Sequence, residues 1–451
     1  MHLPYELLDQ LLLATEFDRE AFVRAHNESA APTSIRLNPT KMPPPDASLQ
    51  PVGWSRFGYY LPQRPSFTFD PLFHAGCYYV QEASSMLLEQ AFTQLMPQDK
   101  PLRALDLCAA PGGKSTHLYS LLPKDSFLIA NEVIRSRAMV LRDNLIRWGA
   151  RQAMVTNNDP EQFRTLENFF DWITVDAPCS GSGLFRKDPS AIEQWSLSAV
   201  QHCALRQQRI LSAAWQALRP GGILFYATCS FSVEENEAMA NWLIAEKNAE
   251  PVSIQLQKEW NIVATEPGYR CWPDRVQGEG FYCCCLRKPV DAAAKEPRNL
   301  ATIFRALGKQ EQSVIAPWIV QRDDFYFQLQ QTVYAWPRHC VHDWQLCSSV
   351  LNVLYSGVRV GQLMRDKLVP DHALSQCDLL SDSIAATSLA LPEAIAFLQR
   401  RSFSITNESK GWCVVTYKQF VLGWINALPN RINNYYPKEL RIIKDSLDGG
   451  E

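Results

Sequence analysis

Residues 103–118 read RALDLCAAPGGKSTHL, a short apolar run followed by a Pro-Gly-Gly turn and a helical pattern. Similar apolar runs follow along the chain: FLIANE (127–132), AMVTN (153–157), DWITVDA (171–177) and ILFYATC (223–229). Helical periods stand between or after them, at 135–148, 197–218 and 234–246. Apolar runs that alternate with helical periods indicate βαβ units. The sequence therefore predicts an α/β fold with a parallel sheet and helices on both faces.

The predicted helix over 135–148 has support from individual residues. The apolar positions recur at helical spacing, at Ala138, Leu141, Leu145 and Trp148. Gly149 then stands where a helix commonly ends in a left-handed cap. We expect the helix to end at this glycine.

The rest of the chain divides by composition and pattern. Two short helical patterns and a proline-rich run precede the sheet region, and a polar stretch follows GEGFYCCCLRK (278–288). GVRVGQL (357–363) and VVTYKQFVLGWINALP (414–429) read as strands of a β-rich tail. We predict an N-terminal domain at 1–70, a central domain at 71–288, a linker at 289–300, a middle α+β domain at 301–375 and a C-terminal domain at 376–451.

Composition excludes several classes of protein. The chain has 451 residues, of which 46% are apolar and 20% charged, the balance of a globular protein. No window approaches the roughly 18 apolar residues of a membrane span, and no basic region precedes the short apolar run near the start. We expect a cytoplasmic protein whose 13 cysteines are reduced. The net charge of −3 decides nothing about nucleic acid, because local clustering matters there.

The first candidate site is the loop after RALDL. Ligands of open α/β sheets bind beyond the carboxyl ends of the strands. Glycines let the backbone approach a ligand closely, and the following helix offers free amide donors to an anionic group. The spacing matches neither G-x-G-x-x-G nor the P-loop, and an ordinary strand-to-helix turn is the alternative. The predicted cofactor loop comprises Cys108, Ala109, Ala110, Pro111, Gly112, Gly113 and Lys114.

Carboxylates follow the next two apolar runs. Glu132 stands at the end of the second predicted strand, where an acidic side chain accepts hydrogen bonds from ribose hydroxyls in dinucleotide-binding folds. Asp159 follows the third, where it could meet an adenine amino group. A solvated loop carboxylate is the alternative at either position.

Cysteines stand at the ends of the last two predicted strands. Asp176 and Cys179 belong to DAPCSGSGLFRKD, and Cys229 to YATCS. Because these strands are consecutive, we expect the two thiols to lie close together in one crevice. Ser232 and Glu235 have the spacing of a capping box, which predicts a helix that starts at about Val233 and favours the Cys229 thiolate.

The other cysteines and the histidines are not predicted to be functional. Cys203, Cys271 and the run 283–285 are expected to be buried, inert thiols. No C-x-x-C pair exists, and His339-Cys340-Val341-His342 lacks the paired spacing of structural zinc sites. We therefore expect no metal.

Four blocks of this sequence together resemble a known family. LDLCAAPGGKSTHL (105–118), VDAPCSGSGLFRKDP (175–189) and YATCSFSVEENE (226–237) look like the signature blocks of the RNA cytosine-5 methyltransferases of the Sun family, and FHAGCYYVQEASSM (73–86) resembles the block before the cofactor loop. The tail is similar to that of bacterial ribosomal-RNA members. The resemblance implies a Rossmann-like class I methyltransferase sheet, a small N-terminal RNA-binding domain and a PUA-like C-terminal extension.

The same resemblance implies roles for individual residues. Residues 108–114 would line an S-adenosylmethionine site, with Glu132 on the ribose, Asp159 near the adenine and Asp176 beside the methionyl part and the target base. Cys229 would be the nucleophile that adds to carbon 6 of cytosine, and Cys179 would assist its release. The expected RNA contacts are Arg36, in TSIRLNPTK, and Arg186 and Lys187 beside the cysteine loop.

The expected partner is RNA, bound by a monomer, and small-subunit ribosomal RNA is favoured over transfer RNA. A DNA cytosine-5 methyltransferase would use the thiol of the Pro-Cys loop as nucleophile, so the second cysteine favours RNA. An inactive RNA-binding assembly factor would have no reason to keep both thiols and the cofactor loop. A methyltransferase for a protein or small molecule would not need the basic and aromatic side chains near the C-terminus, among them Trp424, Arg431, Tyr435 and Lys438.

Overall fold

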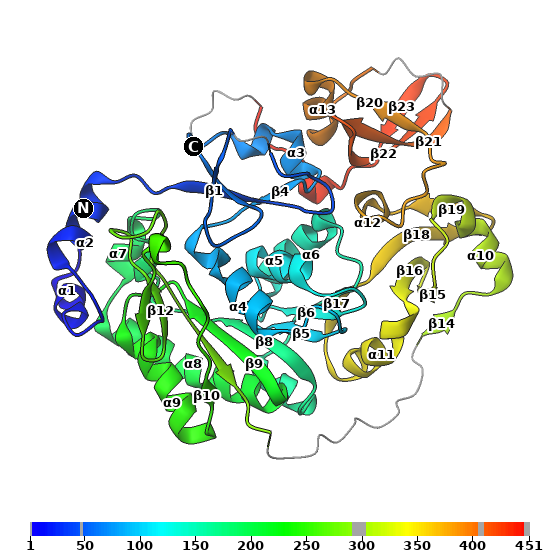
Figure 1. Cartoon of the computed structure of the whole chain (residues 1–451). Helices are drawn as coiled ribbons and strands as arrows, with labels where there is room; N and C mark the ends of the chain where they lie inside the picture. Colours follow the sequence, from blue (N-terminus) through cyan, green and yellow to red (C-terminus); the bar gives the residue numbers. More distant parts are fainter. Residues whose placement is uncertain (1, 46–47, 291–303, 405–409, 446–451) are drawn as a thin grey trace.

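The structure is a computed structural model that describes residues 2–45, 48–290, 304–404 and 410–445 (Figure 1). The central part is built on a ten-stranded sheet with the order β11-β12-β13-β9-β8-β5-β6-β7-β17, and β10 pairs with β13. The parallel strands are β5 (Arg103–Asp106), β6 (Phe127–Asn131), β7 (Ala153–Thr156), β8 (Phe170–Asp176) and β9 (Leu218–Thr228). The antiparallel strands are β10 (Glu250–Pro251), β11 (Val263–Thr265), β12 (Gly268–Cys271), β13 (Phe281–Arg287) and β17 (Val353–Ser356). The predicted α/β class and Rossmann-like sheet are confirmed.

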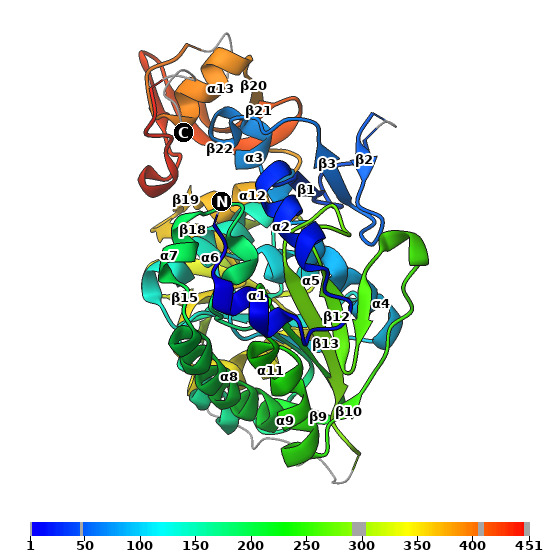
Figure 2. The ribbon, with the colours of Figure 1, turned by 90° about the vertical axis from the view of Figure 1, so that its left-hand side faces the viewer.

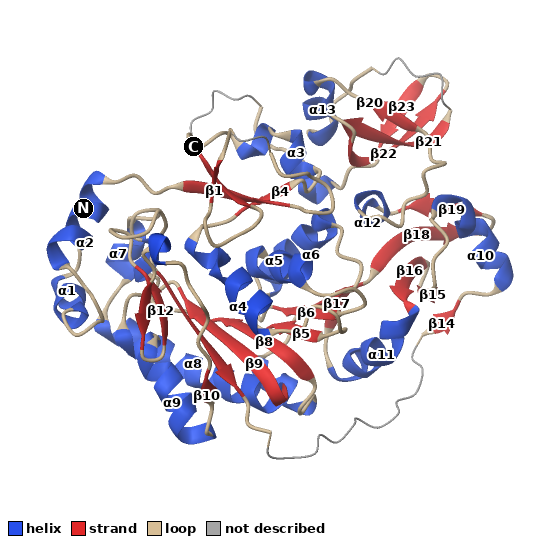
Figure 3. Ribbon diagram, in the orientation of Figure 1, coloured by secondary structure: helices blue, strands red, loops and turns tan. Residues whose placement is uncertain are grey.

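Helices cover both faces of this sheet (Figure 3). Alternate residues of one strand face opposite sides, so Ala104 packs with the helices of one face and Leu105 with those of the other. The first face carries α4 (Leu88–Leu95), α5 (Gly113–Leu121) and α6 (Arg135–Trp148), and the second carries α8 (Leu197–Ala217), α9 (Glu237–Lys247) and α11 (Val341–Val350). α6 ends as predicted, because Gly149 adopts a φ of 84°.

The N-terminal part consists of two helices and a small sheet. α1 (Tyr5–Leu11) and α2 (Arg19–Glu28) share an apolar cluster with the central part, in which Phe22 of α2 packs on Phe231 and Trp272. The sheet has the order β2-β3-β1-β4, with β1 (Thr33–Leu37), β2 (Gln50–Pro51), β3 (Gly58–Leu61) and β4 (Tyr78–Val80). β4 lies beyond the predicted boundary at residue 70, so that boundary falls inside the connection between two strands of one sheet. The short helix α3 (Pro71–His74) precedes β4.

The middle part does not stand apart from the central sheet. Its own sheet contains β14 (Arg305–Ala306), β15 (Asp324–Leu329), β16 (Thr332–Pro337), β18 (Val358–Met364) and β19 (Lys367–Pro370), with α10 (Lys309–Ile315) and α12 (His372–Gln376) beside it. However, β17 pairs with β7, and Trp336 and Trp344 belong to the core beneath the central sheet. Residues 304–375 therefore complete the central fold. Most of the predicted linker, from residue 291 on, lies outside the described residues.

The C-terminal part is a four-stranded sheet that packs on the N-terminal one. Its order is β20 (Ala386–Ser388), β21 (Gly411–Tyr417), β22 (Phe420–Leu428) and β23 (Arg431–Asn434), with α13 (Leu391–Leu398) on one face. Phe397 and Tyr436 share an apolar cluster with Ile35 and Phe67. Figure 2 shows α13, β20, β21 and β22 above the central sheet, next to α3. In the described part of the chain, no helix combines the length and apolar character needed to cross a membrane.

Candidate active site

A cavity of about 530 Å³ lies at the carboxyl ends of the parallel strands. It brings together residues from segments that are far apart in the sequence. Eight of the residues predicted for the site line this cavity: Cys108, Ala110, Pro111, Lys114, Glu132, Asp176, Cys179 and Cys229. This position agrees with the rule for open α/β sheets. Ala109 and Gly113 line a smaller adjoining cavity that shares five of these residues and has a volume of about 170 Å³.

The predicted cofactor loop is held from several sides. Gly112 has a φ of 115°, a conformation that side chains rarely adopt, and a Cβ there would lie 3.2 Å from Leu141. The guanidinium of Arg137 donates to the Ala110 carbonyl at 2.9 Å. Helix α5 begins directly after this turn, so its free amides face the loop. The arrangement suits a ligand with polar or anionic groups.

Charged groups meet at the floor of the cavity. Lys114 Nζ donates to Asp176 Oδ2 at 2.7 Å. Burial alone would lower the pKa of Lys114, but the Asp176 carboxylate beside it raises this pKa above its usual value. Asp106 is fully buried, and its Oδ2 accepts from Ser115 Oγ at 2.6 Å while Oδ1 has no partner. Burial raises the pKa of Asp106 to about 7. The cavity thus contains a paired cation, and the Asp106 carboxyl group lines the smaller adjoining cavity.

The two predicted nucleoside contacts differ in position. Glu132 is buried in the cavity wall, where one oxygen accepts from the Ile134 amide at 2.8 Å and the other lies 3.6 Å from Arg137. Asp159 is outside the lining, although Pro160 belongs to it. The Asp159 carboxylate accepts from the Glu161 amide and from Arg209, both at 3.0 Å. Glu132 is therefore well placed for a ligand, whereas Asp159 lies at the edge.

The two thiols of interest are in direct contact. Cys179 Sγ and Cys229 Sγ lie 3.1 Å apart, after strands β8 and β9, which pair in parallel with Asp176 opposite Ala227. The expected closeness of the thiols is confirmed. The hydrogen bond to Cys229, together with burial, raises the pKa of Cys179 well above its usual range. Either sulfur of this pair can donate the hydrogen bond to the other.

Glu235 ties the two cysteine loops together. Its carboxylate accepts from the Ser180 amide at 2.8 Å, from Ser180 Oγ at 2.5 Å and from Ser230 Oγ at 2.6 Å. The predicted capping box at Ser232 is wrong, because Ser232 Oγ has no partner and Glu235 binds the neighbours of the cysteines instead. Only a 3-10 turn occupies Val233–Glu235, and α9 begins at Glu237, so no α-helix starts next to Cys229.

The predicted RNA contacts are only partly exposed. Arg36 is 1% exposed, and its guanidinium donates to Gln81, to Thr116 and to the Gly113 carbonyl, which braces the first turn of α5. The side chain of Arg186 is 4% exposed and paired with Glu279 at 3.0 Å. Neither guanidinium has an open surface for RNA, which corrects the expectation for these two residues. Lys187 is exposed.

The remaining cysteines mostly follow the prediction. Cys271 and the run Cys283 to Cys285 are buried in β12 and β13, and burial raises their pKa values. Cys203 differs, because it is only half-buried on α8. In no case does a second thiol lie within hydrogen-bonding distance in the described contacts, which sets the pair Cys179–Cys229 apart.

Several cavity residues were not predicted from the sequence. They are Glu82, Ser85, Arg137, Arg206, Arg209, Glu279 and Phe281. The sequence around Glu279 could have predicted its place in the site. Glu279 stands between two glycines at the start of the last predicted strand of the sheet, where a buried apolar residue would be usual. The arginines lie on helices whose orientation toward the cavity depends on the tertiary packing.

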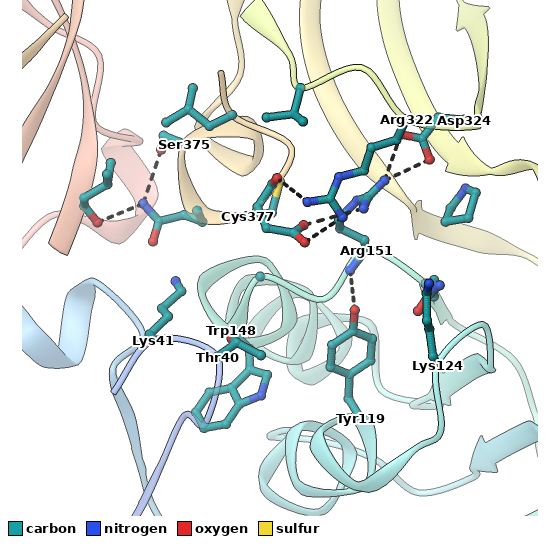
Figure 4. A pocket seen from close by; sticks show the side chains of 18 of the residues that line it. Thr40, Lys41, Tyr119, Lys124, Trp148, Arg151, Arg322, Asp324, Ser375 and Cys377 are labelled. Carbon is teal, nitrogen blue, oxygen red and sulfur yellow. Dashed lines mark hydrogen bonds and ion pairs between the residues drawn. The ribbon is translucent and has the colours of Figure 1, made fainter. Parts of the chain in front are cut away.

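A larger cavity, of about 1090 Å³, lies where the central, middle and C-terminal parts meet (Figure 4). Arg151 donates to both oxygens of Asp324 at 2.8 Å, and Arg322 pairs with Asp378 at 2.9 Å. Lys41 is half-buried there and donates to two backbone carbonyls. These ion pairs connect the parts of the chain, so this cavity belongs to the interface between them.

Family models match three segments of the chain. The model for 16S rRNA methyltransferase RsmB/F matches residues 92–287, that for the N-terminal domain of 16S rRNA methyltransferase RsmF matches residues 3–83, and that for the methyltransferase RsmF PUA domain matches residues 385–442. Together the three segments extend over the N-terminal, central and C-terminal parts.

Individual proteins are similar over most of the length. A ribosomal RNA small subunit methyltransferase F of Vibrio cholerae is 30% identical, over 87% of this chain and 85% of that protein. One from Pectobacterium atrosepticum is 28% identical, over 97% and 96%. The crystal structure of a methyltransferase homologue from Pyrococcus horikoshii superposes with a TM-score of 0.51 at 28% identity, over 63% of this chain and 100% of that one.

Proposed function

The chain belongs to the RsmB/F family of 16S ribosomal RNA methyltransferases, and from this membership we propose that it methylates carbon 5 of cytosine in small-subunit ribosomal RNA through a covalent adduct with Cys229. The single observation that carries the proposal is the contact between Cys179 and Cys229, 3.1 Å apart, in the cavity that the cofactor loop also lines. Two thiols in hydrogen-bonding contact in one crevice suit a reaction in which a sulfur–carbon bond forms and breaks.

The cofactor of this enzyme class is S-adenosyl-L-methionine, which supplies an electrophilic methyl group on a positively charged sulfur. The described residues fit such a ligand, because Glu132 offers an acceptor for ribose hydroxyls, and residues 108–111, 113 and 114 line this cavity or the smaller one beside it. Asp176, held by Lys114, closes the site toward the base. Asp159, next to Pro160 in the wall, would face the adenine amino group.

Cytosine must be activated before it can accept a methyl group, since its carbon 5 is a poor nucleophile. In the proposed reaction the Cys229 thiolate adds to carbon 6, which forms a carbon–sulfur bond and makes carbon 5 part of an enamine. Ring N3 takes up the proton that Cys229 has lost, and Asp176 relays it. The attack comes from above the ring plane, so the base must be presented outside any stack.

Release requires the reverse movement of electrons. After methylation the proton leaves carbon 5, the carbon 5–carbon 6 double bond forms again, and the carbon–sulfur bond breaks with its electron pair on Cys229. Cys179, beside that sulfur, gives its proton to Cys229 and takes the proton from carbon 5, so that its own state is restored. N3 returns its proton to Asp176. Glu235 positions both thiols through the adjacent serines.

Basic surfaces near the cavity and at the C-terminus support an RNA substrate. Arg206 and Arg209 line the cavity and are exposed, and exposed Lys187 follows the cysteine loop, so these cations can contact phosphates. A groove of about 820 Å³ on the C-terminal part contains four cationic side chains and no carboxylate among its lining residues. They are Arg400, Arg401, Arg431 and Lys438, and the aromatic residues Phe403 and Tyr435 also line the groove. Such a surface suits phosphates and unstacked bases.

The experiment that tests the function is a positional map of 5-methylcytosine in total RNA. Cells with the wild-type chain, without it, and with Cys229→Ala are compared. We expect one or more cytosines of small-subunit ribosomal RNA to lose the mark in the last two strains. Loss confined to transfer RNA would overturn the ribosomal assignment, and an unchanged map would overturn the activity.

A further inference from the structure

Glu279 is a buried carboxylate on the wall of the catalytic cavity, and the reaction described above does not use it. Its exposed fraction is 2%. Oε2 accepts from Arg186 Nε at 3.0 Å, whereas Oε1 has no hydrogen-bond partner. An unpaired oxygen of a buried carboxylate is costly, because the group has lost its water without gaining a donor. Its retention beside a cavity indicates that something else supplies the donor.

The chain around Glu279 lies directly against the cysteine loops. The Gly183 amide donates to the Cys229 carbonyl at 2.7 Å, and a Cβ on Gly280 would lie 2.9 Å from Gly183 Cα. On the next residue, the ring of Phe281 faces Lys114, whose Nζ lies 5.1 Å from the ring centroid. Glu279 is therefore adjacent to both the nucleophile loop and the Lys114–Asp176 pair.

The position of the Glu279 side chain is fixed by its surroundings. Arg186 holds Oε2 and also donates to the Gly278 carbonyl at 2.5 Å. The Glu279 amide donates to Glu82 at 2.9 Å, and Glu82 in turn accepts from the amides of Ser84 and Ser85. These contacts hold the Glu279 carboxylate in one position before any ligand binds. A ligand that donates a hydrogen bond to Oε1 therefore does not have to order the Glu279 side chain first.

On the premise that this site methylates cytosine, we propose that Glu279 reads the target base by accepting a hydrogen bond from the exocyclic amino group on carbon 4. Cytosine presents a donor at this position, whereas uracil presents a carbonyl oxygen. A carboxylate oxygen attracts the donor and repels the carbonyl, so the same contact favours one base and rejects the other. Glu279 is thus a specificity-determining residue. Asp176 contacts the neighbouring N3 atom of the base.

The competing explanation is that the Glu279–Arg186 pair only holds the loop before β13 in place. Loss of a structural pair slows the reaction equally with any base. Loss of a contact to the amino group slows it only when that group is present. The two explanations are therefore separated by a cycle in which the protein and the base are changed independently.

The test uses a synthetic RNA that carries the mapped cytosine, and a second RNA with 2-pyrimidinone, which lacks the amino group, at that position. Methyl transfer is measured as kcat/KM for the wild type and for Glu279→Ala. We expect a loss of about 10- to 100-fold on the cytosine RNA, the usual size for a hydrogen bond to a charged group, and less than about 3-fold on the 2-pyrimidinone RNA. Equal losses on both RNAs would overturn the proposal.

Glu237→Gln is the matched control, because Glu237 is also a carboxylate paired with a buried arginine, Arg270, but lies outside the cavity. Any loss in this variant should be the same on both RNAs. A base-dependent loss there would contradict the assignment to Glu279. Thermal melting of each variant in the presence of cofactor shows whether it is folded.

Glu279→Gln gives a second readout that a structural role would not produce. Its amide can donate to the carbonyl of uracil, so this variant should form a covalent adduct with RNA containing 5-fluorouracil at the target position, and the wild type should not. Absence of any adduct gain, with the variant folded and active on cytosine, counts against base reading. If the wild type fails to methylate the cytosine RNA, the proposed function itself is overturned, and this inference with it.

Discussion

Lys114 Nζ lies 2.7 Å from Asp176 Oδ2, although the two residues follow different strands of the central sheet. The contact joins the cofactor loop to the loop that carries Cys179. Lys114 is the only cation that the described contacts pair with Asp176. Any change at Lys114 should therefore affect the cofactor and the base together.

Replacing Lys114 by Met or Glu132 by Gln should weaken S-adenosylmethionine binding by about 1 to 3 kcal/mol, because each removes a charged hydrogen-bonding group from the cavity. Isothermal titration calorimetry measures the loss. Glu161→Gln serves as control, since that carboxylate pairs with Arg164 outside the cavity. Unchanged affinity in both cavity variants would refute the cofactor assignment.

Glu235→Ala should lower kcat by at least about 10-fold and leave the KM for RNA nearly unchanged, because both cysteine loops lose their shared acceptor while the RNA surfaces stay intact. Ser232→Ala provides the contrast. The hydroxyl of Ser232 has no partner, so its loss should change stability by less than about 0.5 kcal/mol. A loss of about 1 kcal/mol or more there, measured by denaturant unfolding, would instead support a capping box.

The sheet and the positions of the site residues could be predicted because they follow from local patterns. Apolar runs, the glycines after β5 and the periodicity of α6 are readable within single segments. Residues that depend on distant segments could not be predicted. Glu235 binds Ser180, 55 positions away, Arg36 reaches Thr116, and β17 joins a sheet whose other strands end at residue 287. No spacing within one segment encodes such contacts.

Charge reversal in the C-terminal groove should weaken RNA binding. Arg431→Glu with Lys438→Glu removes two of its cations, so the dependence of affinity on salt should become shallower by about 2. Lys367→Glu, an exposed cation on the middle part, is the matched control. Equal affinities of the groove variant and the wild type, measured by filter binding from low to high salt, would show that the groove serves another purpose.

Asp106 should make stability fall as pH rises through a defined window. Burial raises the folded-state pKa of Asp106 to about 7, against about 3.9 in the unfolded chain. Between these values the folded state binds more protons, so the contribution of Asp106 to stability is complete below about pH 4 and is lost by about pH 7. Asp106→Asn should remove this dependence.

Denaturant unfolding of the cofactor-free protein at pH 4.5, 6 and 7.5 measures the effect. The difference in stability between Asp106→Asn and the wild type should shift in favour of the variant by about 3 kcal/mol across the series, from about 1.4 kcal/mol per pKa unit. Ser115→Ala is the control that removes the hydrogen-bond donor but keeps the acid. A difference that does not vary with pH would contradict the raised pKa.

The central claim is that Cys229 forms the bond to the base and that Cys179 helps to break it. The direct measurement is a denaturing gel of each single variant incubated with substrate RNA and S-adenosylmethionine. Cys179→Ala should leave protein joined to RNA, because release is blocked after methyl transfer. Cys229→Ala and the double variant should show no shifted band and no methylation. The reverse pattern, with the adduct in Cys229→Ala, would contradict the account by making Cys179 the nucleophile, and methylation by both single variants without any adduct would rule out covalent catalysis here.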